Sequence, residues 1–311
     1  ASFEILNGEV GIFASNVGAF EAHCNYIHDM SLAGIYASGF NSARIYNNVI
    51  ENVGSGVAVP PTYAPVGGTL LNAGGGGFGA ASLPPAMAQA DDDDDLLDDP
   101  VVIEVFDNQI RNVGGDGVAI QSTGSRDLLA SVHNNTITDV RRNGVHFQGS
   151  GYDRIVQVDV FDNTIETVGS AGVLIENYDS GGNLLLAMVS GNSVTDYGTS
   201  YSPDAGIEVY TTGYDYETEI VIADNLVEGA NGSTQDGIRV TVLGTRAGAD
   251  VTVADNEILD PGQHAIAVHH GDSDSSGDGY LNLLVEDNFA TGSGVPRSEE
   301  RRVGKECRSR W

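Results

Sequence analysis

Lysine, cysteine and tryptophan are almost missing from this sequence of 311 residues. It contains two cysteines and one tryptophan, and its 14 Lys+Arg side chains face 44 Asp+Glu side chains. So few cysteines exclude a disulfide framework and any multi-cysteine metal site. The formal net charge of −30 argues against a nucleic-acid partner, because phosphate binding needs clustered Lys and Arg. No apolar run approaches the roughly 18 residues of a transmembrane helix, so no membrane span is predicted.

The rare residue types are concentrated at the C-terminal end. Residues 297–311, RSEERRVGKECRSRW, hold the only lysine, the only tryptophan and one of the two cysteines. This stretch resembles an in-frame translation of a sequencing adapter, so we expect a non-native tail. We also expect the chain to be a metagenomic fragment that is open at both ends. Without the tail the sequence has no lysine and one cysteine, Cys24.

A repeated pattern of about 23 to 33 residues runs along most of the chain. An asparagine recurs with apolar or small residues three and five positions before it and an aliphatic residue two positions after it. A glycine then precedes two alternating apolar residues, as in Gly144-Val145-His146-Phe147. The repeated asparagines are Asn25, Asn48, Asn108, Asn135, Asn163, Asn192, Asn225, Asn256 and Asn288.

The alternation has a period of two residues, which predicts short strands that end at Asn and Gly. About five buried aliphatic side chains per unit contribute roughly 10 kcal/mol. Ordering about 28 backbone residues costs on the order of 30 to 50 kcal/mol. A single unit therefore cannot fold by itself, and the pattern predicts a solenoid in which units stack and bond to their neighbours.

These repeated Asn and Gly positions resemble the right-handed parallel β-helix repeat of the pectin-lyase-like superfamily. The resemblance covers roughly residues 1–59 and 101–290. It implies an all-β solenoid of about nine coils, in which the repeated Asn side chains stack as a ladder inside tight bends. Asn suits such bends because it tolerates the left-handed backbone conformation.

The repeat is interrupted once. Residues 60–100 include Pro60-Pro61, the glycines at 74–77 and the acids at 91–95, which is typical of low complexity. We therefore predict β-helix coils over 1–59, a Gly/Pro/Asp-rich insertion over 60–100, further β-helix coils over 101–296 and the non-native tail over 297–311.

A column of acids directly precedes the repeated asparagines. Equivalent residues of stacked coils lie about 4.8 Å apart, so Asp224, Asp255 and Asp287 would repel one another unless a cation intervened. Ca²⁺, which prefers oxygen ligands, is the natural candidate. In the alternative interpretation, Asp simply suits the end of the strand, where it is exposed and solvated.

A second candidate calcium site lies in the loop that contains Asp272, Asp274 and Asp278. Oxygen-bearing side chains alternate there before glycines, which is similar to the calcium loops of dockerin and EF-hand modules. The sequence departs from that pattern at the twelfth position, where Val285 replaces an acid. An ordinary polar turn is the alternative.

Polar side chains on the strands that follow the repeated glycines form a candidate catalytic set. Stacked coils would bring them onto one outer face, where a tyrosine, an arginine and carboxylates are suited to uronate lyase, epimerase or glycosidase chemistry. The alternative is a solvated polar face with an ion pair between Arg239 and Glu208 on adjacent coils. The candidate residues are Glu176, Glu208, Tyr210 and Arg239.

Two classes of function remain open. We predict a non-catalytic segment of a secreted or cell-surface β-helix protein, which binds a polysaccharide or cell-surface glycan and is stabilised by Ca²⁺. The alternative, which the resemblance implies, is a carbohydrate-active enzyme: a polysaccharide lyase, epimerase or glycosidase. Few basic residues and a strong negative charge disfavour anionic polysaccharides as substrates. Fold alone does not decide between these classes.

Overall fold

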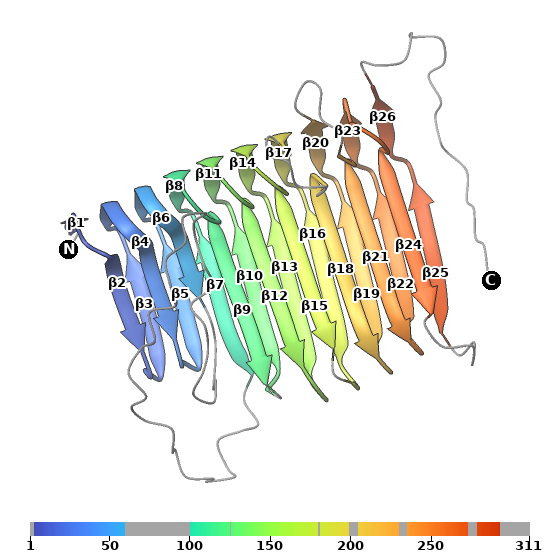
Figure 1. Cartoon of the computed structure of the whole chain (residues 1–311), viewed down its shortest axis with the longest axis horizontal. Helices are drawn as coiled ribbons and strands as arrows, with labels where there is room; N and C mark the ends of the chain where they lie inside the picture. Colours follow the sequence, from blue (N-terminus) through green and yellow to red (C-terminus); the bar gives the residue numbers. More distant parts are fainter. Residues whose placement is uncertain are drawn as a thin grey trace.

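The computed structural model describes residues 3–59, 100–124, 126–179, 181–198, 205–229, 235–272 and 279–292. In these residues the regular structure is entirely β, and the strands run parallel to one another in two sheets. Figure 1 shows the strands stacked side by side in chain order, so that the molecule is an elongated solenoid. The predicted parallel β-helix is therefore confirmed.

One sheet contains nine strands, one from each coil of the described chain. Each strand ends two residues before a repeated asparagine. The strands are β3 (Ala19–His23), β5 (Ser42–Tyr46), β7 (Val101–Phe106), β10 (Leu128–His133), β13 (Ile155–Phe161), β16 (Leu184–Ser190), β19 (Glu217–Ala223), β22 (Gly248–Ala254) and β25 (Tyr280–Glu286).

The other sheet has 17 strands and consists of two strips, with β4 (Tyr26–Ser38) and β6 (Val49–Val59) running through both. We call β1 (Glu4–Leu6) and the strands that begin directly after the repeated asparagines the short strip. The latter are β8 (Gln109–Val113), β11 (Thr136–Val140), β14 (Thr164–Val168), β17 (Ser193–Tyr197), β20 (Leu226–Gly229), β23 (Glu257–Leu259) and β26 (Phe289–Thr291). The strands that follow the next bend form the long strip: β2 (Val10–Ser15), β9 (Val118–Gly124), β12 (Val145–Gly151), β15 (Val173–Asp179), β18 (Ile207–Tyr214), β21 (Ile238–Thr245) and β24 (Ile266–Asp272).

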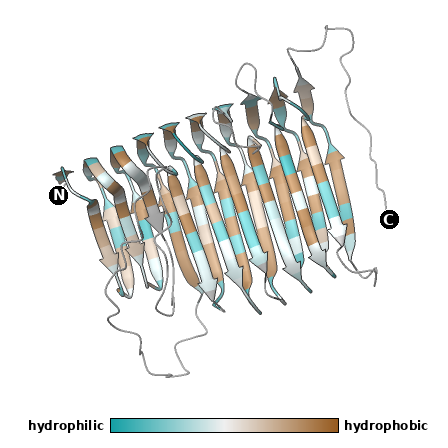
Figure 2. Cartoon of the chain, in the orientation of Figure 1, coloured by the Kyte–Doolittle hydropathy of each residue, from teal (hydrophilic) through white to brown (hydrophobic). Residues whose placement is uncertain are grey.

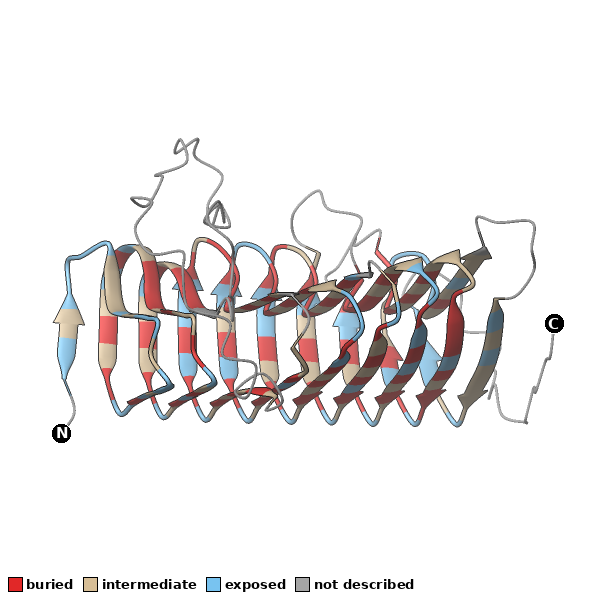
Figure 3. Ribbon diagram, turned by 90° about the horizontal axis from the view of Figure 1, so that it is seen from below, coloured by how far each residue is buried: buried red, intermediate tan, exposed pale blue. Residues whose placement is uncertain are grey.

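The core is a continuous column of aliphatic side chains inside the coils. Successive strands pair in register, so that Val158, for example, lies between Ala130 of the preceding coil and Ala187 of the next. Inward residues such as Val156, Val158 and Val160 are almost fully buried. Figure 3 shows buried and more exposed residues alternating along the strands, and Figure 2 shows the matching alternation of hydropathy. The period of two in the sequence thus separates the core from the outer faces.

The repeated asparagines form a hydrogen-bonded ladder, as predicted. Asn135 Nδ2 donates to Asn163 Oδ1 over 3.0 Å, and Asn163 Nδ2 donates to Asn192 Oδ1 over 2.9 Å. Asn163 Nδ2 also donates to the backbone carbonyls of Val132 and Phe161. Each amide therefore bonds its own coil to both neighbours, which satisfies polar groups that are buried in the bend.

The repeated glycine that directly precedes β9, β12, β15, β18 and β21 is required by close packing between coils. A Cβ on Gly144 would lie 2.5 Å from Ile165 Cγ2 and 2.6 Å from the carbonyl oxygen of Gly172. Both atoms belong to the next coil, which can approach this closely only where no side chain is present.

Most of the predicted insertion and all of the predicted tail lie outside the described residues. The strands on either side of residues 60–99 belong to consecutive coils, because β6 pairs directly with β8 and β9 and β5 pairs with β7. Asn48 Nδ2 correspondingly donates to Asn108 Oδ1 over 3.0 Å although 60 positions separate the two residues.

Candidate functional site

The four predicted site residues lie on the outer face of three neighbouring long-strip strands. Glu176 of β15 pairs in register with Tyr210 of β18, and Glu208 of β18 pairs with Arg239 of β21. The coils therefore bring all four onto one face, as the sequence predicted. Their catalytic role stays a prediction. Glu208 and Arg239 belong to one ion cluster and Glu176 to another, whereas Tyr210 contacts the ring of Tyr178.

The first cluster surrounds Arg239. Its Nη1 lies 3.6 Å from Glu208 Oε2, which confirms the ion pair that was expected between adjacent coils. A stronger partner is the buried Asp236, whose Oδ2 lies 2.8 Å from Arg239 Nε and 2.7 Å from Nη2. The other oxygen of Asp236 contacts His264 Nδ1 at 2.8 Å. Burial alone would raise the pKa of Asp236, but Arg239 and His264 outweigh it and hold the pKa below its usual range.

The second cluster is centred on His146 of β12. Its Nε2 lies 2.9 Å from Glu176 Oε2, and its Nδ1 lies 3.6 Å from Asp116 Oδ2 on the preceding coil. The other oxygen of Glu176 accepts a hydrogen bond from the Tyr178 hydroxyl over 2.7 Å. Asp116 is also fixed by Asn143, whose Nδ2 donates to Asp116 Oδ1 over 2.9 Å. We call Asp116, His146, Glu176 and Tyr178 the His146 cluster.

The partners in the His146 cluster shift one another's protonation strongly. Burial would lower the pKa of His146, but the hydrogen bonds and charges of Asp116 and Glu176 raise it to about 9. The bond to His146 is the main cause that lowers the pKa of Glu176. Burial and the bond to Glu176 raise the pKa of Tyr178. At neutral pH the cluster thus holds an imidazolium between two carboxylates and carries a net charge of −1.

These shifts decide what the two clusters can do chemically. A general acid or base works best when its pKa lies near the working pH. The three carboxyl groups have lowered pKa values: Asp116, Glu176 and Asp236. The three proton donors have raised pKa values: His146, Tyr178 and Arg239. Each of these groups moves away from neutrality, which suits fixed charges and hydrogen-bond partners better than groups that exchange protons.

Beside the ion pairs of the two clusters, the outer face also presents amide and aromatic side chains. Gln121 Nε2 donates to Gln148 Oε1 over 3.2 Å, and the Tyr178 and Tyr210 rings lie 5.9 Å apart at 49°. Tyr178 is 39% exposed. The residues that line up across the strands in this row are Gln121, Gln148, Glu176, Tyr210, Thr241 and His269.

Sequence reasoning missed Asp116, Tyr178 and Asp236. Asp116 and Asp236 directly precede the repeated glycines Gly117 and Gly237, and this shared position was the signal that could have identified them. The role of Tyr178 depends on the rotamer that brings its hydroxyl back to Glu176, for which the sequence carries no signal.

The structure gives a conformational reason for the predicted acid column. Asp224, Asp255 and Asp287 have φ angles of 57°, 54° and 51°, and all three are exposed. Asp and Asn are the side chains that best tolerate this left-handed backbone, and Cys24 occupies the same position with a φ of 56°. The exposed, solvated interpretation therefore accounts for the column.

The predicted calcium loop is only partly within the described chain. Asp272 is the last residue of β24 and pairs with Gly244, whereas Asp274 and Asp278 lie outside the described residues. Across the described part of the chain, no group of three or more His, Cys, Asp or Glu side chains is arranged to hold a metal ion. Calcium binding stays a prediction.

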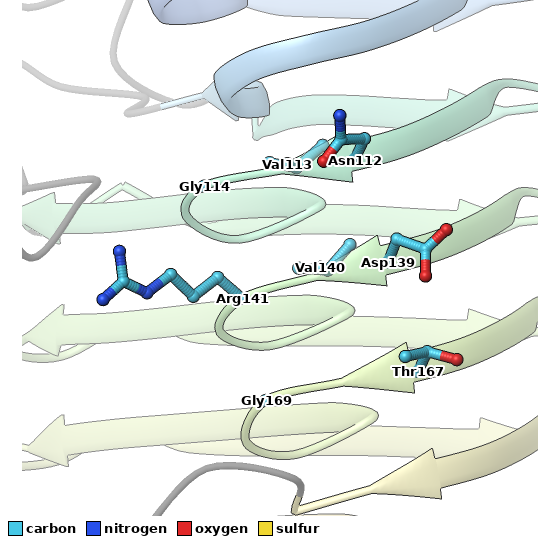
Figure 4. Close-up of a pocket in the computed structure, with 8 residues that line it drawn as sticks. All are labelled: Asn112, Val113, Gly114, Asp139, Val140, Arg141, Thr167 and Gly169. Carbon is cyan, nitrogen blue, oxygen red and sulfur yellow. The ribbon is translucent and has the colours of Figure 1, made fainter.

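A surface hollow lies at the bends that follow β8, β11 and β14. It is lined in part by Asn112, Asp139 and Thr167, which share the left-handed conformation, and by Arg141. Figure 4 shows that the Arg141 side chain extends away from Asp139 and Thr167. The groups that line this hollow therefore do not converge on one point. The His146 cluster remains the better candidate site.

The sheets, the ladder and the register define an all-β parallel solenoid. Residues 97–289, more than half of the chain, match the family described as "Right handed beta helix region", and the chain belongs to this family. Among solved structures, the enzymatically active domain of tailspike protein 2 of bacteriophage CBA120 is similar, with 12% identity and a TM-score of 0.38. The match covers 91% of this chain and 39% of that one. No curated protein matches.

No helix in the described chain is long and apolar enough to cross a membrane.

Proposed function

We propose that this chain is a non-catalytic segment of a secreted or cell-surface β-helix protein that binds a glycan on the outer face of the long strip. The observation that carries the proposal is the pairing within the His146 cluster, which moves every pKa there away from neutrality. The ionisable groups then serve as fixed hydrogen-bond partners. Tyr178 and Tyr210 offer aromatic surface, and Gln121 and Gln148 offer amides for sugar hydroxyls.

The charge of this face favours a neutral glycan. The His146 cluster carries a net −1, and the whole chain carries a formal −30. Both repel carboxylated or sulfated polymers, whereas carboxylates and amides readily accept and donate bonds to neutral hydroxyl groups.

Replacing Tyr178 and Tyr210 together by alanine is expected to weaken binding of a neutral glycan about tenfold or more, because two aromatic contacts are lost. Titration calorimetry against neutral oligosaccharides identified on a glycan array measures this. Tyr152→Ala is the matched control, since Tyr152 is 55% exposed and lies in the turn after β12. Equal affinity of the double variant and the parent protein would reject the proposed face.

A carbohydrate-active enzyme is the second candidate, because clusters of strongly shifted pKa values are enriched at active sites. The same glycan incubations, assayed for new reducing ends and unsaturated products, distinguish the two functions. Product formation that disappears in Glu176→Gln would replace binding with catalysis as the function.

We further propose that Ca²⁺ stabilises the protein through the loop containing Asp272, Asp274 and Asp278. The alternation of acids before glycines in the sequence supports this proposal. Chelation followed by addition of millimolar Ca²⁺ is expected to raise the melting temperature, and Mg²⁺ at the same concentration is the control. A melting temperature indifferent to Ca²⁺, or the same response in Asp274→Asn/Asp278→Asn, would contradict it.

A further inference from the structure

A row of stacked rings runs along the outer face of the nine-stranded sheet, away from the long strip. Each ring belongs to the last residue of its strand, two positions before a ladder asparagine. Successive ring centroids lie 5.0, 4.8, 5.1 and 4.6 Å apart, and the ring planes are within 9° of parallel. The spacing follows the separation of the strands. The rings are His23, Tyr46, Phe106, His133 and Phe161.

The stack ends at Phe161. One face of this ring lies against His133, with centroids 4.6 Å apart. The position opposite its other face is Ser190 of the next coil, and the two coils after that have Ala223 and Ala254 in the same row. A serine side chain is too small to cover a phenyl ring. The ladder of rings therefore stops with one aromatic face that has no ring upon it.

The surroundings of this ring face are apolar on one side and polar on the other. Met188, which is 40% exposed, precedes Ser190 by two residues and so lies on the same outer face. A Cβ on Gly191 would lie 2.5 Å from Asp162 Oδ1, so the Asp162 carboxylate reaches across to the coil of Ser190. A flat ligand placed over Ser190 would thus meet an aromatic face, a thioether, a hydroxyl and a carboxylate.

We propose that the end of this stack is a second glycan subsite, in which one neutral sugar ring stacks on Phe161 above Ser190. The C–H face of a pyranose fits an aromatic ring. The hydroxyl groups of the sugar can bond to Ser190 and Asp162. A purely apolar ligand would instead bury the Ser190 hydroxyl and the Asp162 carboxylate without hydrogen-bond partners. The subsite rests on the proposed glycan-binding function but lies on a different sheet, so it can be tested separately from Tyr178 and Tyr210.

The decisive variant is Ser190→Phe, which adds a sixth ring to the stack and occupies the subsite. It is expected to raise the melting temperature, because stacked aromatic pairs are stabilising, and to remove sugar stacking on Phe161. Ala223→Phe is the matched control: it adds the same side chain one coil further along and leaves the position above Ser190 open. Phe161→Leu keeps an apolar side chain but removes the ring, and it is expected to lose the stacking as well. Because this variant has no Phe161 ring protons, its loss is measured as a lower sugar affinity by titration calorimetry.

The probes are cellohexaose and chitohexaose, followed by the NMR shifts of the Phe161 ring protons, with N-acetyltyrosine amide as an aromatic competitor. We expect shifts in the parent protein and in Ala223→Phe but none in Ser190→Phe. The absence of shifts in the parent, unchanged shifts in Ser190→Phe, or a response to the tyrosine amide alone would overturn the subsite. Sugar binding that is lost only in the Tyr178/Tyr210 variant would reject this subsite and retain the long-strip site.

Discussion

Replacing Asn163 by alanine is expected to lower the free energy of unfolding by about 3 to 5 kcal/mol. The change removes Asn163 Oδ1, which accepts hydrogen bonds from the backbone N–H and the side-chain amide of Asn135. It also removes Asn163 Nδ2, which donates to Asn192 Oδ1. Each buried polar group left without a partner costs about 1 to 3 kcal/mol, and Asn163 is only 1% exposed. Urea unfolding followed by far-ultraviolet circular dichroism measures the loss.

The matched control is Asn288→Ala at the C-terminal end of the described ladder. Asn288 accepts bonds from Asn256 and donates to backbone carbonyls, and it is half-buried rather than buried. Its replacement is expected to lower stability less than Asn163→Ala. Losses of equal size at both positions would show that the ladder bonds do not set the stability of the central coils.

Raising the pH from 6.5 to above 9 is expected to lower stability by about 3 kcal/mol through His146. Its pKa is 6.5 when unfolded and about 9 in the fold, and each pKa unit is worth about 1.4 kcal/mol. Because the folded pKa is raised, the contribution is fully present below pH 6.5 and disappears as the pH rises through 9. Urea unfolding at a series of pH values measures this dependence.

His146→Gln tests the source of this pH dependence. The variant is expected to be less stable than the parent at pH 6.5 and to lose most of the decline toward pH 9, since it has no group to titrate. His269→Gln, at an exposed position of the same outer face, is the control and should keep the decline. A decline that persists in His146→Gln would place its origin elsewhere in the molecule.

The fold was predictable because its determinants recur in the sequence. The repeated asparagines mark the ladder, and the glycines exemplified by Gly144 mark the bends where coils approach closely. The alternating aliphatic residues between them mark the inward face. Each feature appears in coil after coil at the same spacing, so a chance resemblance in one coil cannot imitate the pattern.

The candidate site was predictable only in part. Register alone places Glu176, Glu208, Tyr210 and Arg239 on one face, and it explains the ion pair between Arg239 and Glu208. The division into two clusters depends instead on Asp116 and Asp236, whose side chains bond to residues of the next coil. Their shared position before a repeated glycine could have marked them, but their partners differ between the two coils. Rotamers and hydrogen bonds specific to one coil set those partners, and the repeat pattern does not specify them.

The junction between β6 and β7 shows how freely this architecture accepts added sequence. The ladder passes from Asn48 to Asn108 without a missing rung, although the intervening chain is about twice as long as elsewhere. Strand pairing is set by the rungs on either side, so extra residues at this corner leave the registration of the stack intact. A corner of this kind is a natural graft point, where a binding loop or a whole module can be added while the rod keeps its length and pitch.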